Sequence, residues 1–295
     1  MSNYNREQNV CRLMQTPPTL FFDQNRWFVK YAVQQARKTG HKVVILRNYA
    51  EDTPTCDTPN IPNERISRIN ELYVHLSENP YRAEYYALAR WFYFDHYMQS
   101  NDIDKAMICD SDVLIFESPH EIWNQYDINK NRVGLLCTSM LSGGTCIISS
   151  KMLNKFCSFV LDQYEYQRDS LITEYKKGAN ISDMTFFTKF ISDNLEFEPI
   201  CLNNYDNKLV IDDSTIIKNK LYKFNDTKPF LRRNGNQIAL LHYQGSNKYL
   251  MPFHNEDANL IDILKNIHRI VVYWANSKIY LKAKIRNFVN ILRSR

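Results

Sequence analysis

A short apolar run that stops at two aspartates is the feature that most constrains the fold of this chain. Residues 107–109 (Met-Ile-Cys) follow a turn-like segment at 100–102 and end at Asp110-Ser111-Asp112, after which apolar residues resume at 113–116. Such a run predicts a strand that is buried on both faces, as in the interior of a mostly parallel sheet. Open α/β sheets bind ligands at the carboxyl ends of their strands, so both carboxylates would stand at a ligand site.

Asp110 and Asp112 would bring two like charges to a buried position. That is costly unless a positive group neutralises them. Mg²⁺ or Mn²⁺ would do so, since these ions bind a few carboxylates together with the phosphate oxygens of a substrate. Aspartate pairs after a strand also cap helices or shape turns, and the triplet alone leaves both interpretations open.

The composition limits how a nucleotide could be held. The 295 residues include only 7 glycines, and neither G-x-G-x-x-G nor a Walker A pattern occurs. A glycine-rich phosphate loop is therefore not expected. A metal ion or basic side chains would have to hold the phosphates of any nucleotide, within one large α/β domain or one domain plus a small appendage.

The cysteines and the N-terminus bear on the compartment. Seven cysteines are scattered along the chain without a C-x-x-C pair, and several lie in apolar runs. They are interpreted as reduced core residues, which indicates a reducing compartment. The polar N-terminus lacks the apolar core of a signal peptide, and no run reaches the roughly 18 apolar residues of a membrane span. We expect a cytoplasmic protein.

The N-terminal part has the order strand, helix, strand. Residues 10–14 predict a first strand, residues 23–38 a helix that Gly40 ends, and residues 42–46 a second strand. This order is typical of a parallel α/β sheet.

A long helix over residues 82–98 leads into the central strand. Its Arg82 and Arg90 are either nucleotide contacts near the strand ends or solvated surface residues.

Glycines and an acid stand out after the central strand. Strands at 133–138 and 145–149 flank Ser142-Gly143-Gly144, whose glycines either let backbone approach a ligand or form a tight turn. Helices follow at 151–164 and 182–191. Asp183, directly after the good N-cap residue Ser182, either complements the helix dipole or faces the active site as an acid.

A histidine ends the next apolar strand, residues 237–243. His242 is followed by Gly245 and Lys248. A histidine in such a place is usually a core residue, but here it could complete a metal shell. Gly245 could then admit a phosphate close to the backbone, and Lys248 could neutralise it.

With these motifs in place, the chain resembles the GT-A-fold glycosyltransferases that use nucleotide sugars, and among them glycosyltransferase family 8 and its relatives. The motifs are Asp110-Ser111-Asp112, the preceding helix with Ala89-Arg90-Trp91-Phe92, and His242-x-x-Gly245-x-x-Lys248. The resemblance covers roughly residues 10 to 255. It implies a Rossmann-like α/β domain, 1–255, with a mostly parallel sheet flanked by helices, and a basic helical extension, 256–295.

The resemblance also implies a site. Asp110, Asp112 and His242 would ligate Mn²⁺ or Mg²⁺, which bridges the diphosphate of a nucleotide sugar, and the donor would be a UDP-sugar. Lys248 and the backbone at Gly245 would stabilise the leaving diphosphate, and Asp183 is the other candidate catalytic residue. The further residues expected near the donor or the acceptor are Thr16 after the first strand, Asn48 after the second, Arg82, Arg90, Ser111, Gly143 and Gly144.

Two departures from the family concern the sugar. Many family members have an asparagine in the segment where this chain has Ser142-Gly143-Gly144, and an Asp-Gln pair where it has Asp183-Met184. The donor sugar and the stereochemistry therefore stay open. The His–Lys motif favours a retaining transferase, with a glycan, lipid-linked or protein acceptor.

The C-terminal segment, residues 265–295, is rich in lysine and arginine and contains no acid. It predicts either a helix that lies on an anionic membrane surface, for instance at an inner membrane, or a last helix packed on the core with a solvated basic face.

Other functions remain as alternatives. A phosphohydrolase with Asp110 as nucleophile would carry its D-x-D on the first strand, and a nucleotidyltransferase would show a Gly- and Lys/Arg-rich loop after that strand. A non-catalytic nucleotide- or glycan-binding protein of the same fold is the third. No base-reading module supports nucleic-acid binding.

Overall fold

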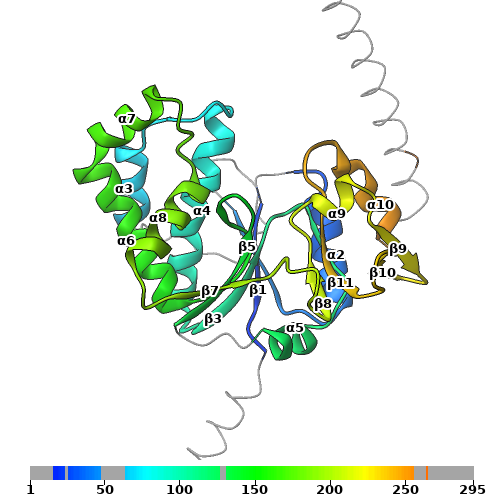
Figure 1. Cartoon of the computed structure of the whole chain (residues 1–295). Helices are drawn as coiled ribbons and strands as arrows, with labels where there is room; N and C mark the ends of the chain where they lie inside the picture. Colours follow the sequence, from blue (N-terminus) through cyan, green and yellow to red (C-terminus); the bar gives the residue numbers. More distant parts are fainter. Residues whose placement is uncertain (1–15, 24–25, 48–63, 127–130, 256–263, 265–295) are drawn as a thin grey trace, which may run out of the picture.

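The structure is a computed structural model that describes residues 16–23, 26–47, 64–126, 131–255 and 264. Figure 1 shows two groups of elements, with most helices on one side of a twisted sheet and a smaller sheet on the other. The expected first strand at 10–14, Asn48 and the expected C-terminal helical segment lie outside the described residues, except for Leu264.

The main sheet has six strands in the order β2-β1-β3-β6-β5-β7. Its strands β2, β1 and β3 are parallel to one another, β6 is antiparallel to both of its neighbours, and β7 is parallel to β5. The predicted α/β class with a mostly parallel sheet is confirmed. The strands are β1 (Thr19–Asp23), β2 (Val43–Arg47), β3 (Lys105–Cys109), β5 (Arg132–Cys137), β6 (Leu141–Ser149) and β7 (Glu198–Cys201).

A second sheet continues the fold beyond the D-x-D segment. Strand β11 pairs antiparallel with β4 and parallel with β8, and β10 and β9 extend the sheet. The strands are β4 (Val113–Ile115), β8 (Leu209–Ile211), β9 (Tyr222–Asn225), β10 (Lys228–Leu231) and β11 (Gln237–His242).

Helices cover both faces of the main sheet (Figure 1). One group is α3 (Glu64–Leu72), α4 (Tyr81–Ser100), α6 (Ser150–Tyr166), α7 (Arg168–Lys176) and α8 (Asp183–Asp193). The helices nearer the second sheet are α2 (Val29–Lys38), α5 (Pro119–Gln125), α9 (Thr215–Lys218), the 3-10 helix η1 (Gly245–Leu250) and α10 (Met251–His254).

Side chains of the central strands enter two separate cores. In β3, Met107 and Cys109 join the core beneath α2 and the second sheet, whereas Ile108 joins the core beneath α4, α6 and α8. In β1, Phe21 lies in the first core and Phe22 in the second. This is why the run before Asp110 is apolar throughout: both of its faces are buried.

The expected start of the chain needs one correction. Asp23 does not begin a helix but ends strand β1, and the helix begins at Val29. The short run from Thr19 to Asp23 becomes a strand because it pairs on both sides, with β2 and with β3. Gly40 ends the helix as predicted: it has a positive φ of 87°, and its N–H donates to the backbone carbonyl of Arg37.

A second correction concerns Ser142-Gly143-Gly144. This segment is not a turn between two strands, because β6 already begins at Leu141 and its pairing with β5 closes at Cys137. The reversal of the chain lies at residues 138–140.

Two findings concern the described cysteines and helices. The described cysteines, at 109, 137, 146, 157 and 201, are free thiols. None of the helices formed by the described residues is long and apolar enough to span a membrane.

Candidate active site

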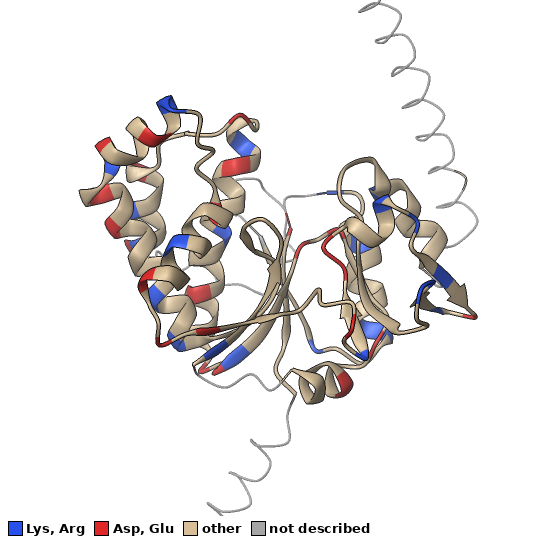
Figure 2. Ribbon diagram, viewed as in Figure 1, with Lys and Arg blue, Asp and Glu red and all other residues tan. Residues whose placement is uncertain are grey.

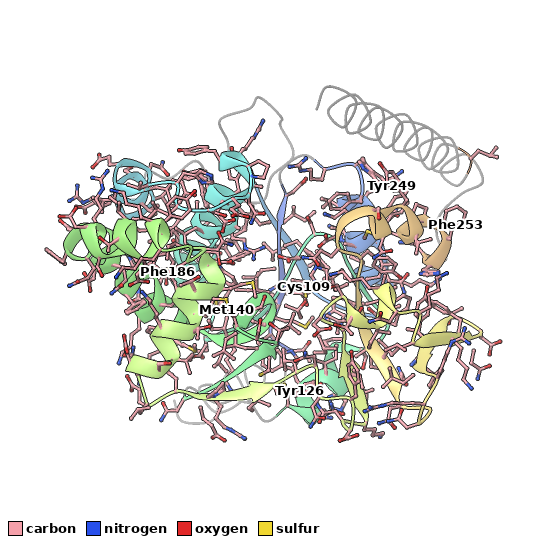
Figure 3. The ribbon with its side chains drawn as sticks, turned by 45° about the horizontal axis from the view of Figure 1, so that its top comes forward. Cys109, Tyr126, Met140, Phe186, Tyr249 and Phe253 are labelled. Atoms are coloured by element: carbon pink, nitrogen blue, oxygen red, sulfur yellow. The ribbon has the colours of Figure 1, made fainter. Side chains whose placement is uncertain are left out.

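The carboxyl end of β3 meets the carboxyl end of β11 at the D-x-D segment. Asp110 donates its N–H to the carbonyl of Gly144 at 2.6 Å, and the carbonyl of Asp112 accepts the N–H of Tyr243 at 2.8 Å. Because β4 pairs with β11, Val113 lies opposite His242. Strand pairing thus brings a histidine next to the two aspartates across 130 residues of sequence. Figure 3 labels Cys109, which directly precedes Asp110, at the centre of the molecule between Phe186 and Tyr249.

Asp110, Asp112 and His242 can hold a single metal ion. One ligand atom from each lies within 4.8 Å of the others. The imidazole Nε2 is 3.3 Å from Asp112 Oδ1 and 3.7 Å from Asp110 Oδ2. Two carboxylates and an imidazole are a donor set that a divalent cation such as Mn²⁺ or Mg²⁺ can use.

Lys248 holds the second aspartate. Its Nζ lies 2.9 Å from Asp112 Oδ2 and 4.9 Å from the centre of the Phe28 ring. The 3-10 helix η1 carries this lysine, and the stacking of Trp27 on Tyr249 fixes that helix against the start of α2.

Arg90 holds the first aspartate. Its guanidinium pairs with Asp110 and, at 3.2 Å, with Asp183 Oδ2, which also accepts the indole N–H of Trp91 at 3.3 Å. Asp183 begins α8, where Ser182 forms the N-cap with a capping box. The structure thus places Asp183 at a helix N-terminus and next to Arg90, while its role as an acid of the active site stays a prediction.

These contacts set the protonation of the site. Burial opposes charging of the His242 imidazole, but the neighbouring Asp112, Asp110 and Asp212 carboxylates prevail and raise the pKa of His242 to about 9. For Asp112, burial is likewise outweighed by His242 and Lys248, which hold its pKa well below the usual range. Burial raises the pKa of Asp183, with Arg90 opposing that shift. The acidic and basic groups of the site therefore neutralise one another: His242, Lys248 and Arg90 pair with the carboxylates.

A cleft of about 410 Å³ opens beside this cluster. Its lining combines the D-x-D segment and three cationic residues with two phenylalanines and an alanine. The lining residues are Phe22, Arg26, Phe28, Ala83, Arg90, Asp110, Ser111, Asp112 and Lys248. Figure 2 shows acidic segments in the middle of the molecule, between the helices on the left and the second sheet on the right.

Some residues expected at the site are not there. Thr16 precedes β1 instead of following the first strand, so it stands at the amino end of β1 and not at the edge that carries Asp110. Arg82 is exposed on the first turn of α4 and lies over the Tyr86 ring, while Ala83 beside it lines the cleft.

Gly245 has a φ of 67°, a backbone conformation that favours glycine, in the segment between His242 and Lys248.

Sequence reasoning missed the contributions of β1, α2 and β8. Phe22, Arg26 and Phe28 line the cleft, and Asp212 lies behind His242. The signal for the first three was the apolar run at 20–22 followed by Asp23, which has the same form as the run at 107–109 before Asp110.

Close packing, not a turn, explains the two glycines of β6. A Cβ on Gly143 would stand 2.5 Å from the Trp91 ring and 2.8 Å from the Phe187 ring. A Cβ on Gly144 would stand 2.8 Å from Asp110 Oδ2. Gly143 therefore lets α4 and α8 pack on the sheet, and Gly144 leaves room for the carboxylate at the site.

Gly143→Ala is expected to destabilise the fold by about 1–3 kcal/mol, as overpacked cores do. Both rings that its methyl group would meet are fully buried and stack against other aromatic rings, so they have little room to move. Urea unfolding would measure the loss, with Ser139→Ala in the exposed reversal as the control. An unchanged free energy of unfolding would contradict this account of the packing.

The comparisons with known proteins concern the fold. No protein-family model matches the chain, and no curated protein matches it. A glycosyltransferase involved in glycosylation of the major capsid of PBCV-1 is similar at 7% identity and a TM-score of 0.44, over 81% of this chain and 99% of that one. The galactosyltransferase LgtC, solved with donor and acceptor sugar analogues, is similar at 14% identity and a TM-score of 0.46, over 82% and 90%.

A third similar structure is the glycosyltransferase GlyE of Streptococcus pneumoniae, at 14% identity and a TM-score of 0.37, over 62% of this chain and 45% of that one. The chain thus spans less than half of GlyE. All three proteins are glycosyltransferases. At these identities and TM-scores the likeness extends to the fold at most, so the activity of this chain rests on its own residues.

Proposed function

We propose that this protein is a metal-dependent glycosyltransferase that transfers a sugar from a UDP-sugar to a glycan, lipid-linked or protein acceptor. The observation that carries the proposal is the convergence of Asp110, Asp112 and His242 on one point, where the two aspartates and the neighbouring Lys248 line the cleft. Two carboxylates with an imidazole and a cation beside them suit a ligand that brings its own metal-bound diphosphate.

The remaining walls suit the rest of such a donor. Phe22 and Phe28 offer aromatic surface to a nucleoside, and Arg26 adds a positive charge at the same cleft. Arg90 and Asp183 pair with each other beside Asp110, where Arg90 can donate to sugar hydroxyls and the Asp183 carboxylate can accept from them. In the proposal the nucleoside therefore lies towards α2 and the sugar towards α8.

Bond cleavage at the sugar leaves a diphosphate whose negative charge grows as the bond breaks. A bound Mn²⁺ would act as a Lewis acid on the phosphate oxygens. Lys248 would supply a second positive charge, which it can do by leaving Asp112 when the ion takes that carboxylate. Retention of the sugar configuration is part of the proposal, and it is supported by the resemblance of His242-x-x-Gly245-x-x-Lys248 to the family motif.

The test is an assay of nucleoside diphosphate release from a panel of nucleotide sugars with Mn²⁺. We expect release from a UDP-sugar, with UDP as the nucleotide product and the configuration readable by NMR. Release of pyrophosphate from a sugar phosphate and UTP would favour the nucleotidyltransferase alternative. Nucleotide binding without turnover of any donor would favour the binding-protein alternative.

Lys248→Met is expected to raise the affinity for Mn²⁺ alone about tenfold and to lower the affinity for UDP in the presence of Mn²⁺. The first effect follows because Asp112 loses its competing partner, the second because the diphosphate loses a charge-assisted contact. Calorimetric titration of both ligands would measure the opposite shifts, with Lys223→Met on β9 as the control. Two shifts in the same direction would contradict this role of Lys248.

The basic segment 265–295, outside the described residues, is proposed to bring a cytoplasmic enzyme to an anionic membrane surface that carries its acceptor. Its support is composition: lysines and arginines without an acid, interspersed with aromatic residues. Co-sedimentation of the full chain with anionic and with neutral vesicles would decide between this role and the alternative of a helix packed on the core.

A further inference from the structure

Asp212 is a fully buried carboxylate that does not line the cleft. It follows β8, and its Oδ2 accepts the backbone N–H of His242 at 3.3 Å, while its Oδ1 accepts the N–H of Ile216 at 2.9 Å. Its own N–H is donated to the carbonyl of Leu240 at 3.0 Å. The buried side chain of Asp212 thus connects the start of α9 to the end of β11, where the candidate metal ligand His242 lies.

The imidazole of His242 lacks the support that metal-binding histidines usually have. Such a histidine normally donates its second ring nitrogen to a carboxylate or carbonyl, which fixes the orientation of the ring. Here Nε2 faces Asp112 and Asp110, but the buried Nδ1 has no hydrogen-bond partner among the residues that the structure describes. The ring is therefore positioned through its backbone, and the backbone at His242 is held by Asp212.

The residues after Asp212 hold the next part of the same segment. The Ser214 hydroxyl lies 3.2 Å from Gln244 Oε1, and Lys218 Nζ donates to the same oxygen at 2.8 Å. Ser214 is buried with a φ of 81°. A non-glycine residue in that conformation costs of order 1–3 kcal/mol and persists only where its surroundings fix it. Residues 212–218 thus form hydrogen bonds to His242 and Gln244, which precede Gly245 and Lys248 in the chain.

We propose that Asp212 is a positioning residue for the metal site: it fixes the end of β11 so that the His242 imidazole meets the cation held by Asp110 and Asp112. This inference rests on the proposed function, because it needs a cation at that cluster. A merely structural Asp212, acting only through Ile216 at the start of α9, would affect stability and leave metal affinity unchanged.

Asp212→Asn and Asp213→Asn make a matched pair for the test. Asp213 is the adjacent acid, and its carboxylate accepts hydrogen bonds from the side-chain amide of Asn203 and from the N–H of Thr215, neither of which involves His242. Mn²⁺ affinity of the full chain would be measured by the paramagnetic resonance of free Mn²⁺, with circular dichroism to establish folding. We expect Asp212→Asn to bind Mn²⁺ about 10–100-fold more weakly, as loss of a supporting contact does, and Asp213→Asn to bind as the unaltered chain does.

Equal Mn²⁺ affinity in Asp212→Asn, with or without a lower melting temperature, would overturn the inference and leave the proposed function standing. Absence of Mn²⁺ binding in the unaltered chain would contradict the proposed function and remove the inference with it. If Asp212→Asn does not fold, Asp212→Glu gives the same comparison, because it keeps the buried charge but displaces the carboxylate by one methylene group. The same loss of affinity is expected there.

Discussion

Asp112→Asn is expected to lower kcat/KM for the nucleotide sugar about a thousandfold, which corresponds to the several kcal/mol that a metal ion contributes to such a transition state. Asparagine has the same shape but no charge. It would weaken the bond to the cation and leave His242 and Lys248 facing each other without the carboxylate that lies between them. Both changes act on the group that must hold the diphosphate.

Steady-state kinetics with the best donor of the panel would measure this loss, and circular dichroism would establish that the variant is folded. Asp162→Asn on the exposed side of α6 is the control. If Asp112→Asn kept more than a tenth of the activity, Asp112 would be a residue of the turn and not a metal ligand.

Arg90→Met is expected to destabilise the fold by about 3–5 kcal/mol, the cost of removing one partner from a buried ion pair. The Arg90 side chain is 14% exposed, and methionine would leave Asp110 and Asp183 without the cation that lies between them. Burial already raises the pKa of Asp183 against the opposing effect of Arg90. The variant is therefore expected to lose stability and donor binding together.

Urea unfolding at neutral pH would measure the free energy of unfolding, with the exposed Arg168→Met as a control that changes it by less than about 0.5 kcal/mol. Part of the loss should be recovered at lower pH, where the Asp183 carboxyl, whose pKa burial raises, can be protonated. A loss below 1 kcal/mol, or the same loss at every pH, would contradict the role of Arg90 as the counter-charge of both acids.

The sequence predicted those parts of the fold that have strong local patterns. The strand before Asp110, the helix over 82–98 and the strand ending at His242 carry apolar runs or helical spacing, and all three are present. The D-x-D segment and His242-x-x-Gly245-x-x-Lys248 were found for the same reason. Their meeting through the β4–β11 pairing follows only from the fold.

The parts that could not be predicted depend on contacts between distant residues. The short apolar run before Asp23 is compatible with a strand or with a buried helix segment, and Asp23 is a residue type that often forms a helix N-cap. Pairing with two neighbouring strands, which no local pattern encodes, makes this run a strand. Arg90 and Asp183 lie 93 positions apart, so neither side chain indicated that the other is its partner.

Asp212 was missed for a different reason. Asp212-Asp213-Ser214 has the composition of an ordinary turn. Its burial and its bond to His242 arise because β8 runs beside β11, a parallel pairing of strands that are far apart in the chain.

Calorimetric titration of the unaltered chain with UDP, in the presence and in the absence of Mn²⁺, tests the central claim most directly. The account predicts that UDP binds tightly only with Mn²⁺, because the diphosphate reaches Asp110, Asp112 and His242 through the ion. It also predicts that Asp112→Asn removes the difference. Binding of UDP that is equally tight with and without Mn²⁺, and unchanged in Asp112→Asn, would contradict it.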